Sequence, residues 1–225
     1  MPFDRERAAF AAFRLAIDGR EAVRQQMERA IAEVYWTYDT TLRENRFTVG
    51  GVVEFVVGAA LRACGVGVRH KGTVDGDIDL LFDEGDVGYS IKAIFKGTGT
   101  RLVNTMGTAP TAERWQAATL FLLSGTGIVY ADPALPWWVA NRDRCIRPSG
   151  DAITVSKRCI VAFATEHQEW LAPCRLPEER DRPQRPHPAR SHSADLAAQV
   201  LIHYPALLGE LAGLRPGEEI PGAQG

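Results

Sequence analysis

The stretch DIDLLFDEGDVGYSIKAIF, residues 77–95, places charged side chains where a buried hairpin normally carries apolar ones. Its two apolar runs flank a short spacer that contains glycine, which is typical of two strands joined by a turn. Because side chains alternate between the faces of a strand, Asp77 and Asp79 share one face of the first strand. Ser90 and Lys92 share a face of the second strand in the same way. Carboxylate, hydroxyl and ammonium groups are therefore predicted to converge on one side of a sheet.

The preceding segment adds another acidic residue to this set. Residues 48–65 are predicted to form a buried helix that ends at Gly65, and Glu54 is the only acidic residue in it. Partly buried charges need partners, so one interpretation is a simple ion pair between Asp79 and Lys92. The other interpretation is a site for a hard divalent cation, which binds carboxylate and carbonyl oxygens.

The order of these residues resembles the PD-(D/E)xK nuclease superfamily, and most closely its Mrr-type restriction-endonuclease branch. That branch combines a helix bearing an acidic residue, a strand of the kind G-(I/V)-D-(L/V), and a strand that ends in (E/Q)xK. Glu54 on its helix, then GDIDLL, a short turn and YSIKAIF follow the same order within residues 47–96. The resemblance implies an α/β (α+β) protein with a restriction-endonuclease-like core, in which helices flank a central mixed β-sheet. Extra helices would lie at both ends of the chain.

The resemblance also implies roles for individual residues. Asp79 would be the main metal-binding carboxylate, and the main-chain carbonyl of Ile91 would be a further ligand. Glu54 would bind the metal directly or through water. Lys92 would orient or activate the water that attacks the phosphate.

Two positions leave alternatives open. Ser90 stands where the family has Glu, Asp or Gln, and a hydroxyl is an uncharged and poor ligand for Mg²⁺. Either Glu54 supplies the missing carboxylate or the nuclease is weak or inactive. Asp77 is a second candidate ligand on the face of Asp79, although the spacing to Lys92 favours Asp79.

Further polar residues are candidates for contacts with DNA. The segment KGTGTRLVNTMG, residues 96–107, follows the proposed catalytic lysine and supplies Lys96, Arg101 and Asn104. Such donors bind the DNA backbone, although a plain flexible loop is the alternative. Lys and Arg within residues 141–159 form either another contact surface or a normally solvated exterior.

The resemblance implies a metal-dependent DNA endonuclease, a hydrolase that uses Mg²⁺ or Mn²⁺ and serves a restriction or defence system. Its partners would be double-stranded DNA, a second copy of the chain in a homodimer, and a methyltransferase or another defence-system component. One alternative is a structure-specific nuclease of DNA repair or recombination. Others are a catalytically inactive DNA-binding subunit on the same fold, and a helical interaction protein in which Asp79 and Lys92 merely pair.

Composition is that of a globular protein with a substantial core, since 45% of the 225 residues are hydrophobic and 24% are charged. No apolar run approaches the roughly 20 residues that span a membrane, so no membrane partner is expected. The opening, MPFDRERAAFAAFR, is charged from its fourth residue, which predicts a cytoplasmic protein. The four cysteines form no CxxC pair and are expected to be reduced thiols.

The elements that must position the site follow from hydrophobic periodicity and turn residues. A helix is predicted over 19–42 with a capping box formed by Asp18 and Glu21, and helical composition extends over 111–124. Strands are predicted within 127–133, 136–142 and 152–165, and a helix kinked at Pro205 over 193–213. The predicted parts are an N-terminal helical segment (1–45), the nuclease-like core (46–176), a Pro/Arg-rich linker (177–192), and a C-terminal helix with a tail (193–225).

Overall fold

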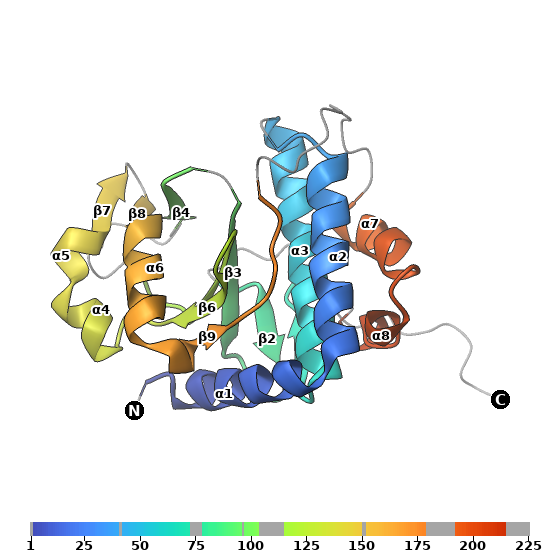
Figure 1. Ribbon diagram of the computed structural model, residues 1–225, viewed down its shortest axis with the longest axis horizontal. Coiled ribbons are helices and arrows are strands. Elements are labelled where there is room, and N and C mark those ends of the chain that lie inside the picture. The colour runs from blue at the N-terminus through green and yellow to red at the C-terminus, as the bar shows by residue number, and fades with distance from the viewer. Residues whose placement is uncertain are drawn as a thin grey trace.

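The computed structural model of the protein describes residues 2–40, 42–72, 78–95, 97–103, 115–149, 152–178 and 192–214 (Figure 1). These residues form an α/β protein in which helices flank a central mixed sheet, as the sequence predicts. None of the helices within these ranges combines the length and the apolar character needed to cross a membrane.

Within the described residues, the central sheet has six strands in the order β1-β2-β3-β5-β6-β9. Their bounds are β1 (Val68–His70), β2 (Leu80–Phe82), β3 (Gly88–Ile94), β5 (Thr119–Leu123), β6 (Gly127–Ala131) and β9 (Leu171–Ala172). β3 and β5 run parallel, whereas each other neighbouring pair is antiparallel. Every residue of β5 and β6 is buried, as expected for strands covered on both faces.

A second, smaller sheet is formed by strands that lie between β3 and β9 in the sequence. It is antiparallel, with the strand order β4-β8-β7. Its strands are β4 (Gly99–Val103), β7 (Ile146–Ser149) and β8 (Ala152–Ser156), and the short helices α4 (Pro136–Ala140), α5 (Arg142–Cys145) and α6 (Lys157–Glu166) lie around it (Figure 1). Trp138 of α4 is 1% exposed and its ring packs on Phe163 of α6. This tryptophan is therefore part of the core.

Three helices begin the chain: α1 (Asp4–Gly19), α2 (Glu21–Thr37) and α3 (Arg43–Ala63). α2 and α3 stand side by side next to the sheet, and α1 runs beneath the sheet to the base of α2 (Figure 1). α3 contacts the sheet at β1 and β3, and it also packs on α2 and α7 (Ser193–Leu201). A helix covered on several sides must be apolar around most of its surface, which explains the VVEFVVGAAL run.

The C-terminal helices cover the outer side of α3 and α2. After α7 come α8 (Pro205–Leu208) and α9 (Leu211–Leu214), so the helix expected over 193–213 is broken rather than kinked. Pro205 lacks the N–H that would continue α7, which explains the break. Tyr204 Oη donates a hydrogen bond to Glu33 of α2 at 2.7 Å, and Ala206 N donates to Gln26 at 2.8 Å.

Tertiary contacts override several local predictions. Residues 119–123 form β5, whereas the sequence predicted a helix over 111–124, of which 111–114 lie outside the described residues. These five residues lie between β3 and β6 in the sheet. Strand pairing on both sides outweighs their helix propensity. The strand predicted over 136–142 is also wrong, because α4 begins at Pro136 and proline suits the first position of a helix.

Two further predictions need partial correction. The run 152–165 is half strand and half helix, because β8 ends at Ser156 and α6 follows directly. The capping box is absent, since α1 extends to Gly19 and so contains Asp18, and α2 begins without a side-chain cap. The linker predicted over 177–192 lies largely outside the described residues.

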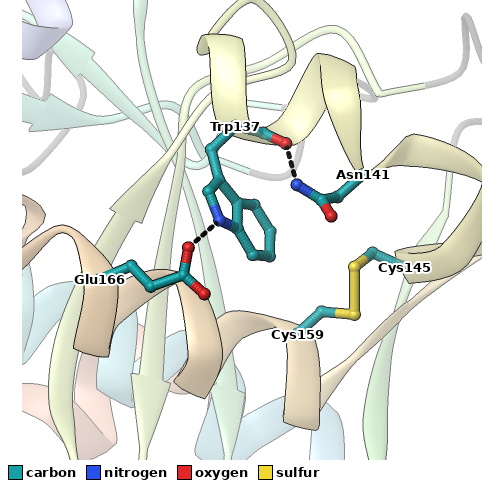
Figure 2. The surroundings of a disulfide bond; sticks show 5 residues. All are labelled: Trp137, Asn141, Cys145, Cys159 and Glu166. Atoms are coloured by element: carbon teal, nitrogen blue, oxygen red, sulfur yellow. Dashed lines mark hydrogen bonds between the residues drawn. A yellow bond between two sulfur atoms is a disulfide. The ribbon is translucent and has the colours of Figure 1, made fainter.

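Cys145 and Cys159 form a disulfide, which corrects the prediction of four reduced thiols (Figure 2). The bond joins α5 to α6 with a Cα–Cα distance of 5.7 Å. The pairing of β7 with β8 brings the two cysteines together, because Cys145 precedes β7 and Cys159 follows β8. Cys64 and Cys174 are free.

Removing this disulfide is expected to lower the free energy of unfolding by about 3 kcal/mol, because the crosslink restricts the unfolded chain. The variant is Cys145→Ser/Cys159→Ser, and urea unfolding measures the change. Thiol titration in denaturant provides the control, with Cys64 and Cys174 reacting before reduction and all four cysteines after it. Four reactive thiols in protein that was never reduced would show that the bond does not form.

Gly88 permits a close approach between β2 and β3. A Cβ atom at this position would lie 1.9 Å from the main-chain oxygen of Leu80, which cannot move without disturbing the strand pair. Gly88→Ala is therefore expected to lower the free energy of unfolding by about 3 kcal/mol. Gly50→Ala is the matched control, because a Cβ there meets no atom within 4 Å and alanine favours a helix by about 0.5–1 kcal/mol. Equal urea midpoints for the two variants would refute the close approach.

Candidate active site

Asp79 lies immediately before β2, at the point where pairing with β3 begins. Its main-chain N–H donates to the carbonyl of Tyr89 at 2.9 Å, and its own carbonyl accepts from Lys71 N at 3.0 Å. The main chain of Asp79 is thus held from both sides, by β3 and by the segment that follows β1. This support gives the carboxylate a defined position.

Among the described residues, three donors from β3 converge on one oxygen, Asp79 Oδ2. Ile91 N donates at 2.6 Å, Lys92 Nζ at 3.1 Å and Ser90 Oγ at 3.2 Å. The convergence follows from strand register, because the pairing of β2 with β3 stops at Leu80–Tyr89. Beyond that point, this edge of β3 faces the side chain of Asp79 instead of β2, while the other edge pairs with β5.

The main-chain carbonyl of Ile91 faces the same edge of β3 as Asp79. In a strand, the N–H and C=O groups of one residue point toward the same neighbour. Ile91 N donates to Asp79, whereas Ser90 N donates to Ala118 on the opposite side. The carbonyl of Ile91 is therefore directed toward the carboxylate.

Glu54 approaches this group from α3. Its Oε2 atom lies 2.9 Å from Nε2 of His70, and the His70 ring stacks on Phe55 with a centroid distance of 4.3 Å. His70 Nδ1 accepts a hydrogen bond from Gly72 N at 3.0 Å. Nδ1 therefore carries no proton, so the neutral ring bears its proton on Nε2 and donates to Glu54.

Burial and neighbouring groups shift the pKa of the Glu54 carboxyl group. Burial raises the pKa of its carboxyl group, the hydrogen bond from His70 lowers that pKa, and the charge of Asp79 raises it again. The charge of Lys92 acts in the opposite direction and lowers the pKa. Glu54, Asp79 and Lys92 are therefore within electrostatic reach of one another. Their side chains are 20%, 19% and 27% exposed, so solvent reaches all three.

The structure thus assembles Ser90, Ile91 and Lys92 directly around Asp79. The ion pair between Asp79 and Lys92 is present, with further hydrogen bonds to the same carboxylate. Asp77, Lys96 and Asn104 lie outside the described residues, and Arg101 is described only through its main chain, which pairs with Thr154 in the second sheet.

His70 is the site residue that the sequence reasoning missed. The sequence did contain a signal for its position, because the helix before Gly65 and the strand after it have matching lengths. The helix from Glu54 to Ala63 rises about 14 Å, and an extended chain from Val66 to His70 returns about 13 Å. A strand that doubles back along α3 therefore brings His70 beside Glu54.

The donor chemistry of the site fits a hard cation. No group of three or more His, Cys, Asp or Glu side chains in the described part of the chain is arranged to hold a metal ion. The predicted set is different in kind, because it combines two carboxylates with a main-chain carbonyl. Asp79 Oδ1 and Glu54 Oε1 accept no hydrogen bond from the residues that the structure describes. Such oxygens suit Mg²⁺.

No protein-family model matches the chain, and neither does any curated protein or solved structure with which it was compared.

Proposed function

We propose that this protein is a metal-dependent DNA endonuclease of the PD-(D/E)xK type, which hydrolyses phosphodiester bonds in double-stranded DNA with Mg²⁺ or Mn²⁺. The observation that carries the proposal is the contact of Asp79 with the Ser90, Ile91 and Lys92 segment, beside Glu54. A restriction-endonuclease-like core is supported by the order of α3, the β1-β2-β3 meander and the parallel strand β5 in one mixed sheet.

Each residue has a role in this proposal. Asp79, Glu54 and the carbonyl of Ile91 would hold the metal ion, and Ser90 would fix Asp79 through its hydroxyl. When bound, Mg²⁺ supplies positive charge that stabilises the phosphoryl oxygens and lowers the pKa of a bound water. Lys92 is held next to Asp79 and is open to solvent, so its ammonium group can position the attacking water against the phosphate.

A second candidate is a catalytically inactive DNA-binding subunit on the same fold. Ser90 favours it, because the hydroxyl donates to Asp79 at 3.2 Å and brings no negative charge to a metal ion. The PD-(D/E)xK pattern has a carboxylate or an amide at this position. In such a subunit, the residues around Asp79 would keep their contacts but would no longer catalyse hydrolysis.

A plasmid digest with Mg²⁺, with Mn²⁺ and with EDTA tests the proposal on methylated and unmethylated DNA. Metal-dependent cleavage is the expected result. Cleavage of plain duplex at defined sites favours a restriction system, whereas cleavage limited to branched or damaged DNA favours a repair or recombination nuclease. Protein that binds DNA but never nicks it with either metal supports the inactive subunit and overturns the endonuclease.

The proposal includes a homodimer, with a methyltransferase or another defence-system component as a partner. Two active sites would allow both strands of a duplex to be cut. The apolar faces of α2 and α7 pack on α3, so the interface would have to use other surfaces. Sedimentation with and without DNA measures the oligomeric state.

A further inference from the structure

A pocket lined by three arginines lies beside the second sheet. Its residues are distant from Asp79 in the sequence. It has a volume of about 460 Å³ and is lined by Arg144 of α5, Arg147 of β7 and Arg158 of α6, together with Ser156, Cys159 and Glu166. All three arginines are exposed. Within the described part of the chain, none of them forms an ion pair with a carboxylate. Several positive charges around one concave surface attract anions.

The one acidic residue among these lining residues is already engaged. Glu166 accepts a hydrogen bond from Trp137 Nε1 at 2.6 Å (Figure 2). Arg144 lies over the ring of the same tryptophan, 6.0 Å from its centroid, and not against the carboxylate. Glu166 and the other residues that the structure describes therefore leave the hydrogen-bond donors of these arginines available.

The disulfide holds two of these arginines in place. Arg144 directly precedes Cys145, and Arg158 directly precedes Cys159. The bond between α5 and α6, which Figure 2 shows, therefore restrains the main chain next to both arginines. α5 is only four residues long and could not fix its position through helical hydrogen bonds alone.

The start of α6 adds to the positive potential. Arg158 and Cys159 lie in its first turn, and Ser156 precedes it without forming a side-chain cap. The first N–H groups of a helix lack partners within the helix and carry partial positive charge. Arg158 and Cys159 of this first turn line the same pocket as Arg144 and Arg147.

We propose that this pocket binds backbone phosphates of a DNA strand, and that the disulfide holds Arg144 and Arg158 in position for this contact. The choice of DNA as the polyanion rests on the proposed function. Two contacts connect the elements around the pocket to the strand that carries Lys92. β3 carries Lys92 and contacts β4, and Lys157 N at the start of α6 donates to Thr98 O just before β4 at 2.8 Å.

Fluorescence anisotropy with a labelled duplex in EDTA measures this contact without cleavage. Arg144→Ala/Arg158→Ala is expected to weaken binding about 10-fold or more near 0.1 M salt and to reduce the slope of log K against log salt by about 1.8. The matched control is Arg29→Ala/Arg175→Ala, which removes the same charge at two exposed positions outside the pocket. This control is expected to bind nearly as the wild type does.

A second arm tests the disulfide. Cys145→Ser/Cys159→Ser is expected to weaken DNA binding in the wild-type background and to have no further effect once Arg144 and Arg158 are alanine. An equal loss in both backgrounds would overturn the positioning role. Circular dichroism establishes that each variant is folded, and the arginine variant decides the phosphate contact by itself if the serine variant does not fold.

The outcomes separate this inference from the endonuclease proposal. If the wild type nicks DNA and the Arg144→Ala/Arg158→Ala variant binds as tightly as the wild type, the pocket inference fails alone. If the wild type binds DNA through these arginines but never nicks it, the endonuclease proposal fails alone. A wild-type protein that binds no DNA overturns both.

Discussion

Asp79→Asn is expected to reduce metal-dependent DNA cleavage on the order of 1000-fold or more, while the protein remains folded. The asparagine keeps the shape of the side chain and an oxygen that accepts from Ile91 N and Lys92 Nζ. It removes the negative charge that would hold a cation. Loss of a metal ligand removes several kcal/mol of transition-state stabilisation, which corresponds to a rate factor of about this size.

The control for this variant is Asp83→Asn. Asp83 follows β2 at its other end, where it pairs with Arg62 at 2.9 Å and is 45% exposed. It has the same charge as Asp79 and flanks the same strand, but it does not belong to the site, so cleavage should be unchanged. Rates from a supercoiled-plasmid assay, melting temperatures and DNA affinity in EDTA separate loss of chemistry from loss of fold. Full cleavage by Asp79→Asn would refute the proposed role of Asp79 in metal binding.

Asp132→Ala is expected to lower the free energy of unfolding by about 3–5 kcal/mol, the largest stability effect that the structure predicts. Asp132 is completely buried, and the described residues donate four hydrogen bonds to its carboxylate. Arg7 donates from Nε and Nη2 at 2.8 and 2.9 Å, and Tyr130 Oη and Ala134 N each donate at 2.9 Å. The alanine would leave a guanidinium group without its partner and bury an unpaired hydroxyl.

The matched control is Asp4→Ala, because Asp4 also lies near Arg7, at 3.8 Å, but is 56% exposed. Exposed pairs contribute about 0–1 kcal/mol, so the two variants should differ several-fold in their effect on urea unfolding. The double variant Arg7→Ala/Asp132→Ala should be less destabilised than the sum of the single variants, because both remove the same pair. Strict additivity would show that the pair contributes little.

The sequence by itself determined the elements whose signals are local. The hairpin within 77–95 was predictable because a period of two and a glycine-containing turn depend only on neighbouring residues. α2 and β6 follow equally from periodicity within one segment. The sequence also indicated that Asp79, Ser90 and Lys92 would share one side of that hairpin.

Tertiary structure decided the features that depend on distant neighbours. Residues 119–123 are a strand because β3 and β6 lie on either side of them, and no local signal carries that information. The Cys145–Cys159 bond depends on how β7 pairs with β8.

At the site, the sequence supplied the residue types and tertiary structure supplied their contacts. The register of β2 against β3 ends at Leu80–Tyr89, and this single feature turns Ile91 N and Lys92 toward Asp79 Oδ2. The return of β1 along α3 sets His70 against Glu54. Strand register and helix packing are properties of two segments together. One segment of sequence therefore specifies which functional groups are present, but not which of their atoms come into contact.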